Sequence, residues 1–290
     1  TEGVERLSIP PLFFSDGPMG VRAEFADNEW RNTGTTDDFV SYLPCNSAVA
    51  STWNRELAGE EGRVLGEEAR GRGKDMILAP GINIKRSPFC GRNFEYYSED
   101  PLLTGKMGAA MVRGIQSQHI GAAVKHFACN NKETNRKHSD SRVSERALRE
   151  IYLKAFEIIV KEADPWVIMS AYNMINGHRA SENHDLLEGI LRDEWHFQGM
   201  VTSDWWTRGE HYKEIKAGND VKMACGFPER VKKAGIVMAV MALIYTGIMW
   251  SIIILAPKYL IMIFSSDATL IKDVVPALKL YFAAFIFMDL

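Results

Sequence analysis

The sequence predicts an α/β fold: an incomplete TIM-type (β/α)8 barrel followed by one to two transmembrane-like helices. Up to residue 231, short apolar runs alternate with longer stretches of helical periodicity, which is typical of a mainly parallel sheet. No GxGxxG motif follows the first run, and this favours a barrel over a dinucleotide-binding sheet. From Ala234 to Ala256 no residue is charged, a length sufficient to span a bilayer. We therefore expect two domains, residues 1–231 and 232–290.

The strand candidates are short apolar runs that each end at a polar cluster. They are Leu12–Ser15, Ala48–Ser51, Met76–Ala79, Ala122–Lys125, Val167–Ser170, Met200–Ser203 and a weak run at Val221–Met223. An eighth strand is not visible, so the barrel is expected to be incomplete. Helices are predicted between the runs, as at Arg55–Gly71 and Glu145–Lys161, with Ser144 as a candidate N-cap of the second.

Composition excludes some classes of function. The formal net charge is only -3, and no basic run is interleaved with aromatic residues, so a nucleic-acid partner is not expected. The cysteines are scattered without a CxxC pair, which fits neither a zinc site nor a disulfide framework: Cys45, Cys90, Cys129 and Cys225. We expect them to be reduced thiols.

The segment Gly199–Trp206 carries the lead catalytic candidate. Its apolar run ends at Asp204, which two tryptophans follow. In a barrel, the carboxyl ends of the strands converge on the mouth where active sites are built, so Asp204 is placed beside an aromatic wall. The structural alternative is an aspartate that caps the next helix and a tryptophan that fills the core.

Further polar residues follow other strands and should meet Asp204 at the same mouth. They are Asp16, Arg22, Arg92, Glu95, Lys125, His126, Tyr172 and Trp205. One carboxylate ringed by cations, a phenol, an imidazole and an indole is a poor metal site, and we expect no metal or cofactor. The set suits a sugar, because hydroxyls accept from cations and a pyranose face stacks on an aromatic ring. The same cations are expected to keep Asp204 ionised.

Each of these residues also has a structural interpretation. His126 could be a satisfied core histidine and Lys125 a solvated charge. Arg92 and Glu95 could form an ion pair without a catalytic role. The conjunction of all of them in one mouth, rather than any single residue, favours a functional site.

Five linked motifs resemble the N-terminal barrel of glycoside hydrolase family 3, on its β-glucosidase side. They are DGPMGVR (16–22), GRNFEYYSEDP (91–101), KHFACNNKETNR (125–136), SAYNMING (170–177) and TSDW (202–205), in order over residues 6–231. The resemblance implies a retaining hydrolase of terminal β-D-glucosyl residues, with Asp204 as nucleophile and a β-glucoside or oligosaccharide as substrate. It assigns sugar binding to Asp16, Arg22, Arg92, Lys125, His126, Arg136, Tyr172 and Trp205.

The resemblance also implies a general acid supplied by a glutamate of a second domain, and no such domain is recognisable after residue 231. Glu95, Glu133 and Glu210 are alternatives that spacing does not distinguish, and the loop containing His138 departs from the pattern that supplies the acid in the family's hexosaminidases. Hydrolysis is therefore expected to be impaired. A membrane-anchored, inactive sugar-binding chimera is the alternative.

Residues 232–290 resemble a fragment of a multidrug and toxic compound extrusion (MATE) transporter, through a long apolar helix, PKYLIMIFSSD and PALKLYF. This implies a lipid bilayer as partner through residues 234–290, and Lys232 and Lys233 favour a cytoplasmic barrel. A buried pair of core helices is the soluble alternative. If the join near residue 231 is an artefact of two misjoined reading frames, the barrel is expected to be cytoplasmic. The remaining functional alternative is a fragment of a drug or cation antiporter.

Overall fold

A computed structural model of the chain describes residues 3–22, 40–224 and 228–283. The chain divides into two compact units, Thr1–Gly226 and Phe227–Leu290. The first contains the predicted site and the second the apolar helices, and each is described by itself below.

The first unit is built on a parallel sheet in the order β1-β2-β3-β5-β8. Its strands are β1 (Phe14–Asp16), β2 (Met76–Leu78), β3 (Gly121–Phe127), β5 (Val167–Ser170) and β8 (Met200–Ser203). The central strand β3 is buried along its whole length, as expected of a parallel strand covered on both faces. Because neighbours in the chain are neighbours in the sheet and all strands are parallel, their carboxyl ends meet at one edge.

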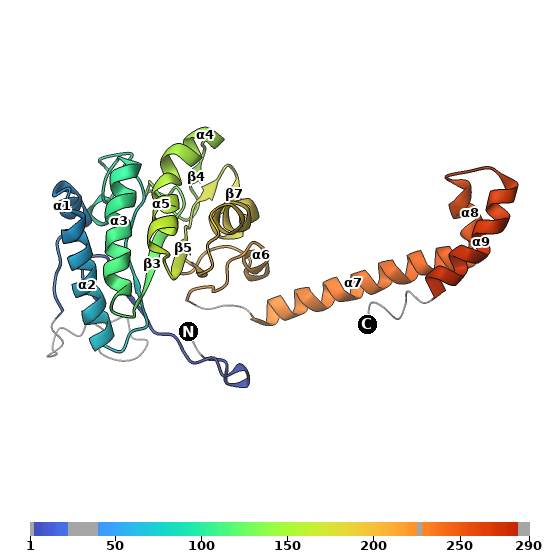
Figure 1. Ribbon diagram of the computed structural model, residues 1–290, viewed down its shortest axis with the longest axis horizontal. Helices are drawn as coiled ribbons and strands as arrows, with labels where there is room; N and C mark the ends of the chain where they lie inside the picture. Colours follow the sequence, from blue (N-terminus) through green and yellow to red (C-terminus); the bar gives the residue numbers. More distant parts are fainter. Residues whose placement is uncertain (1–2, 23–39, 225–227, 284–290) are drawn as a thin grey trace. The chain divides into compact units, whose positions relative to one another are not determined.

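Helices follow the strands and cover the sheet, with α2, α3 and α5 packed side by side (Figure 1). The longer helical segments are α2 (Arg55–Gly71), α3 (Pro101–Gln116), α5 (Lys154–Ala163) and a π-helical segment, Asp185–Glu194. The shorter ones are α1 (Asn46–Ser51), α4 (Glu145–Ala147), α6 (His211–Lys216), the π-helical Leu148–Tyr152 and the 3-10 turns Glu5–Leu7, Asn93–Glu95 and Ala180–Glu182. A small second sheet joins β4 (Asp140–Ser141), β6 (Met174–Ile175) and β7 (His178–Arg179).

Glycine allows α2 and α3 to approach each other closely. A Cβ built on Gly62 would lie 2.3 Å from the backbone oxygen of Met111, and one on Gly114 would lie 2.1 Å from that of Gly59. No side chain fits at such distances, so the contact requires glycine at these positions.

Several predicted elements coincide with the structure. The helix Arg55–Gly71 and the strands Val167–Ser170 and Met200–Ser203 have the predicted bounds. Ser144 caps the next helical region, since its hydroxyl accepts from the amide of Ala147. The predicted helix Glu145–Lys161 is interrupted by a π-helical segment and continues to Ala163.

The predicted strand Ala48–Ser51 was wrong, because these residues lie in helix α1. A short apolar run fits a buried strand or one buried helical turn equally well, and here Val49 and Ala50 face the core from a helix. The weak run at Val221–Met223 forms an isolated parallel bridge, Thr202 with Val221, rather than a strand. The five described strands in this order fit part of a barrel-like wall.

The second unit contains α7 (Pro228–Leu255), α8 (Pro257–Met262) and α9 (Ala268–Ala283). Within the described residues, one helix is long and apolar enough to cross a membrane, at Val231–Leu255. The second predicted apolar run, from Val274 to residue 290, lies partly outside the described residues. Its described part belongs to α9, which contains Pro276 and carries charges. The indole of Trp250 donates to the backbone oxygen of Phe282 at 3.0 Å, which joins α7 to α9.

Candidate active site

Asp204 follows β8 and is held at the carboxyl edge of the sheet. Its backbone N–H donates to the oxygen of Ser170 on the neighbouring strand at 3.1 Å. Its Oδ1 accepts from the N–H of Trp205 at 2.7 Å, and its Oδ2 accepts from the guanidinium of Arg136 at 2.9 Å. The residue is only 8% exposed, so these contacts hold its carboxylate in a buried position.

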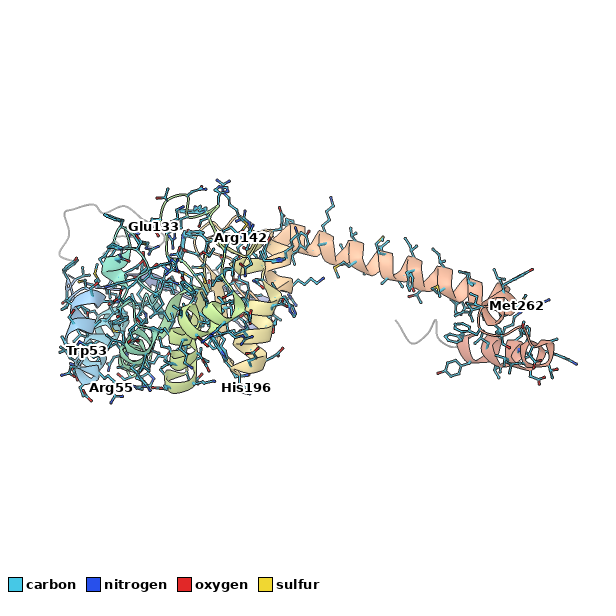
Figure 2. All side chains as sticks on the ribbon, turned by 90° about the horizontal axis from the view of Figure 1, so that it is seen from above. Trp53, Arg55, Glu133, Arg142, His196 and Met262 are labelled. Atoms are coloured by element: carbon cyan, nitrogen blue, oxygen red, sulfur yellow. The ribbon has the colours of Figure 1, made fainter. Side chains whose placement is uncertain are left out.

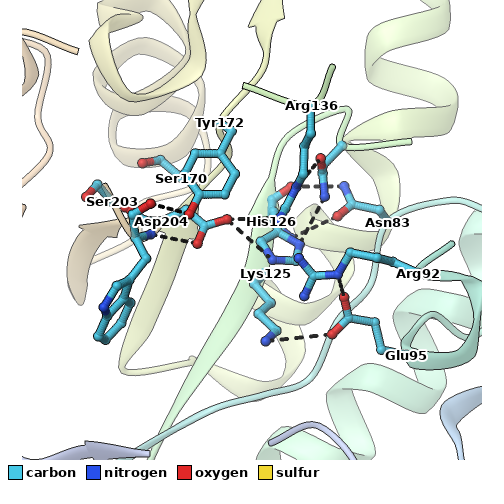
Figure 3. Close-up of polar contacts among 12 residues, drawn as sticks. Asn83, Arg92, Glu95, Lys125, His126, Arg136, Ser170, Tyr172, Ser203 and Asp204 are labelled. Atoms are coloured by element: carbon cyan, nitrogen blue, oxygen red, sulfur yellow. Dashed lines mark hydrogen bonds and ion pairs between the residues drawn. The ribbon is translucent and has the colours of Figure 1, made fainter. Parts of the chain in front are cut away.

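Lys125 and His126 reach the same region from β3, where the register with β5 shifts between Lys125 and Phe127. Such an irregularity re-aims side chains, and both residues are buried polar groups. The Nε2 of His126 lies 3.7 Å from the Oδ2 of Asp204 (Figure 3). The Nζ of Lys125 lies 3.0 Å from the Oδ1 of Asp16, at the end of β1.

Arg136 lies at the centre of the polar cluster. Besides Asp204, its guanidinium donates to the Oδ1 of Asn130 at 3.1 Å and lies 3.4 Å from the Oε1 of Glu133. It also covers the ring of Tyr172, with its central carbon 4.6 Å from the ring centroid. A single side chain therefore fixes the relative positions of the carboxylate and the aromatic wall.

Tyr172 and Trp205 form the aromatic side of the site. The hydroxyl of Tyr172 donates to the backbone oxygen of Trp205, which directly follows Asp204. Arg22 lies beside Asp16, because its backbone N–H donates to the oxygen of Asp16 at 2.9 Å. The structure thus brings together the predicted residues from five separate segments, and their roles in binding stay predictions.

Arg92 forms an ion pair with Glu95, whose other oxygen lies 3.7 Å from the Nζ of Lys125 (Figure 3). Glu95 is 1% exposed. Its carboxyl group thus contacts two cations, one through each oxygen. This geometry favours a structural role for Glu95 over the alternative of a general acid.

Burial and nearby charge set the protonation of the site. Burial raises the pKa of Asp204 above its ordinary value, although Arg136 and the N–H of Trp205 act against this. The predicted cations do lower the pKa of Asp204, but desolvation is the larger effect and the net shift is upward. That Asp204 is ionised at neutral pH stays a prediction. Burial and the charges of Arg92 and Arg136 bring the pKa of His126 well below its usual value, so its imidazole is neutral.

Asp16 behaves differently from Asp204. Burial raises the pKa of its carboxyl group, but Lys125 and Arg92 outweigh this, and the pKa lies below the ordinary value. Asp16 is therefore ionised near neutral pH, and its carboxylate can accept hydrogen bonds from hydroxyl groups.

Three site residues were given no role by the sequence reasoning. Asn83 exchanges two hydrogen bonds of 2.9 Å with the backbone of His126. The hydroxyl of Tyr96 lies 3.3 Å from the Nδ1 of His126 and accepts from Asn130 at 2.9 Å. Tyr96 and Asn130 lie within motifs already recognised, whereas Asn83 lies in a loop whose sequence gives no such signal.

The arrangement can bind a polyhydroxylated ring and present a carboxylate to it. No group of three or more potential metal ligands occurs in the described part of the chain. The buried carboxylate, the neutral imidazole and the cations can form hydrogen bonds with hydroxyl groups.

Comparisons with known proteins identify the family of the chain. The family model of the glycosyl hydrolase family 3 N terminal domain matches residues 17–248. The chain is 56% identical to beta-glucosidase A of Butyrivibrio fibrisolvens over 228 residues, which cover 79% of the chain and 26% of the relative. It is 46% identical to an exo-alpha-(1->6)-L-arabinopyranosidase of Bifidobacterium longum, covering 77% of the chain and 29% of the relative.

Solved structures give the same result. Beta-glucosidase 3B from Thermotoga neapolitana, in complex with glucose, aligns with a TM-score of 0.71 and 50% identity over 77% of this chain and 31% of that one. The glucose complex of a beta-glucosidase from Kluyveromyces marxianus aligns with a TM-score of 0.72 and 41% identity, over 78% and 26% of the two chains. The chain spans less than a third of the length of these relatives. It belongs to glycosyl hydrolase family 3 through the N-terminal domain of that family.

Proposed function

We propose that the chain is a β-glucosidase-type glycosidase that acts by retention, with Asp204 as its nucleophile. The observation that carries this is the setting of Asp204: a buried carboxylate within reach of Arg136 and His126 at the carboxyl edge of the sheet. A retaining glycosidase forms a covalent bond between such a carboxylate and the anomeric carbon. The proposed substrate class is terminal β-D-glucosyl residues of glucosides or oligosaccharides.

The proposed sugar-binding residues divide by charge. Asp16 offers a carboxylate to hydroxyls at the far end of the ring, while Arg22, Arg92, Lys125, His126 and Arg136 offer donors and Tyr172 and Trp205 an aromatic wall. Lys125 joins the two groups, because its Nζ contacts Asp16 directly. We infer that the hydroxyls of a bound sugar compete with the ion pair of Lys125 and Asp16 for hydrogen bonds to these two side chains.

The proposed reaction also needs a proton donor. Retention requires a second carboxyl group about 5 to 5.5 Å from the first, which protonates the leaving group. In the described part of the chain, Glu95 is paired with two cations and Glu133 contacts Arg136, so neither is placed as a free acid. We therefore expect the first bond-forming step to be fastest with leaving groups that need no proton.

The test is covalent trapping. A dinitrophenyl β-glucoside with fluorine in place of the hydroxyl beside the anomeric carbon should add one fluoroglucosyl group to Asp204, located by mass spectrometry of peptides. Asp204→Asn should slow labelling by on the order of a thousandfold or more. The exposed Asp220→Asn is the control. Labelling of another residue, or unchanged labelling of Asp204→Asn, would remove the proposed nucleophile. The matching α-L-arabinopyranoside tests the alternative sugar.

We also propose that Val231–Leu255 lies in a lipid bilayer, with the barrel on the cytoplasmic side. The helix has 25 residues, and its most apolar stretch of 18 residues has a mean hydropathy of 2.2, with only 6% of that stretch buried. At 1.5 Å per residue it is about 37 Å long, enough to cross the hydrocarbon core of about 30 Å. The likeness of residues 232–290 to a transporter fragment stays a prediction.

Flotation of the full chain with phosphatidylcholine vesicles tests the bilayer proposal. The wild type should float with the vesicles and resist extraction at alkaline pH, whereas Met241→Lys combined with Ile244→Lys should weaken both. Lys233→Gln is the control for the number of charges. Release of the wild type by alkaline extraction would contradict insertion, and protease protection of the barrel in sealed cytoplasmic-side-out vesicles would contradict the orientation.

A further inference from the structure

The two ring nitrogens of His126 face different groups, so the position of the ring proton decides what the imidazole presents to Asp204. Its Nε2 lies 3.7 Å from the Oδ2 of Asp204 (Figure 3). Its Nδ1 lies 3.3 Å from the hydroxyl of Tyr96 and 3.4 Å from the amide nitrogen of Asn130. A neutral imidazole has one N–H, so one nitrogen donates a hydrogen bond and the other accepts one.

The imidazole of His126 is held in one orientation. The residue is 1% exposed, and Asn83 exchanges two hydrogen bonds with its backbone. The ring of Tyr96 packs edge-on against the imidazole, with the ring centroids 6.3 Å apart. Turning the imidazole over would place a carbon atom instead of Nδ1 beside Asn130 and Tyr96, and a buried hydrogen bond would be lost.

Arg136 fixes the orientation of the Asn130 side chain. A guanidinium group only donates hydrogen bonds, and the Nε of Arg136 lies 3.1 Å from one polar atom of the Asn130 amide. That atom is therefore the oxygen, Oδ1. The amide nitrogen, Nδ2, then donates to the hydroxyl of Tyr96 at 2.9 Å and points to the Nδ1 of His126 at 3.4 Å.

This orientation of Asn130 determines where the proton of His126 lies. The amide nitrogen is a donor only, so the Nδ1 of His126 meets it as an acceptor. The hydroxyl of Tyr96 can donate to the backbone oxygen of Asn130 at 3.4 Å or to this Nδ1, and both choices leave Nδ1 without a proton. The single proton of a neutral His126 is therefore on Nε2, which faces Asp204.

The surroundings of His126 keep its imidazole neutral. Burial is the largest effect, and three neighbouring cations act in the same direction, so the pKa lies well below its usual value. One carboxyl group and the phenol of Tyr96 complete the ionisable surroundings within the described residues. The cations and the carboxyl group are Arg92, Lys125, Arg136 and Asp204.

We propose that Asn130 is a positioning residue that holds His126 as the Nε2–H tautomer, so that a proton and not a lone pair faces Asp204. The importance of Asp204 rests on the proposed function, whereas the tautomer rests on the hydrogen bonds alone. A lone pair on Nε2 would repel a carboxylate, while an N–H is attracted to it. The distance of 3.7 Å is longer than a hydrogen bond, so the Nε2 proton stays available to an oxygen atom of a ligand.

Nitrogen NMR of the full chain in detergent, with isotope-labelled histidine, tests the tautomer directly. The signals of His126 are those lost in His126→Gln. Near neutral pH they should show a proton on Nε2 and none on Nδ1. The exposed His196 is an internal reference, and Figure 2 shows it well apart from Glu133, which contacts Arg136. In water a free imidazole exchanges between its tautomers, so the nitrogens of His196 should give averaged signals.

Asn130→Asp replaces the amide donor with a carboxylate of the same shape. Arg136 should keep this carboxylate ionised, and because it only accepts hydrogen bonds, the Nδ1 of His126 should become protonated. The resulting imidazolium would pair with the Asp204 carboxylate and slow covalent labelling roughly tenfold. Asn131→Asp is the matched control: the side chain of Asn131 donates to the backbone oxygen of Ile84, and the substitution should leave the protonation of His126 unchanged.

A wild-type chain with the His126 proton on Nδ1 would overturn the proposal, and this measurement needs no substituted chain to fold. An unprotonated Nδ1 in Asn130→Asp would also overturn it, as would labelling as fast as in Asn131→Asp. Trapping of the wild type separates this result from the fate of the proposed function. The expected tautomer without labelling of Asp204 retains the role of Asn130 and removes the nucleophile, whereas labelling with the proton on Nδ1 does the reverse.

Discussion

Glu61 is a buried carboxyl group on α2 whose replacement should change how stability depends on pH. It is 8% exposed, and its Oε1 has no hydrogen-bond partner within the described part of the chain. Desolvation raises its pKa from 4.5 to about 7. A carboxyl group in this setting is kept protonated by the fold while the unfolded chain releases its proton.

The sign and size follow from linkage. Between pH 4.5 and about 7 the folded state binds the proton and the unfolded state does not, so stability falls as pH rises through this window and levels off above it. A difference of roughly 2.5 pKa units corresponds to a ceiling of about 3.4 kcal/mol. Glu61→Gln should therefore stabilise the chain by up to about 3 kcal/mol at pH 8 and have little effect near pH 4.

Urea unfolding followed by tryptophan fluorescence, in detergent at several pH values, measures this difference. Glu67→Gln is the control, because Glu67 lies on the same helix with its side chain 63% exposed. It should change stability by less than about 0.5 kcal/mol at every pH. A Glu61→Gln effect that is the same at pH 5 and pH 8 would show that the folded state does not hold Glu61 protonated.

Two further outcomes follow from the site and the helix packing. The rate of labelling at Asp204 should fall as the pH drops through the raised pKa of this carboxyl group, and Arg136→Ala should move that fall to higher pH, because the strongest opposing charge is lost. Arg142→Ala is the control, since its side chain is 80% exposed, and it should leave the pH dependence unchanged. An unchanged pH dependence in Arg136→Ala would refute the electrostatic account. Gly62→Ala should lower the free energy of unfolding by about 1–3 kcal/mol, because the added methyl group overpacks the contact with α3. Gly71→Ala should be tolerated, since a Cβ there meets no atom within 4 Å. Equal melting temperatures of the two variants would refute the packing argument.

Much of the sheet could be predicted from the sequence, because buried parallel strands such as Val167–Ser170 and Met200–Ser203 are short apolar runs that end at polar residues. The same rule failed at Ala48–Ser51, where one buried face of a single helical turn gives an identical pattern. It also misplaced the first strand, predicted at Leu12–Ser15 and found at Phe14–Asp16.

The sequence predicted which residues form the candidate site but not which hydrogen bonds connect them. Linked motifs indicated Asp204 and its cations, since each motif begins at or follows a strand of the sheet. The support that Asn83 gives to His126 depends on the approach of two backbone segments, which no local pattern records. The raised pKa of Asp204 likewise depends on its depth in the fold rather than on which charges accompany it.

The segment Val221–Met223 sets a lower limit on the length of any working fragment. Its backbone accepts from the N–H groups of Ser203 and Trp206, and the N–H of Met223 donates to the hydroxyl of Ser203. The peptide that carries Asp204 is thus hydrogen-bonded to residues that form no regular strand of their own. A shortened version that stops before Met223 would keep every side chain proposed to bind the sugar and still leave Asp204 without these supporting contacts.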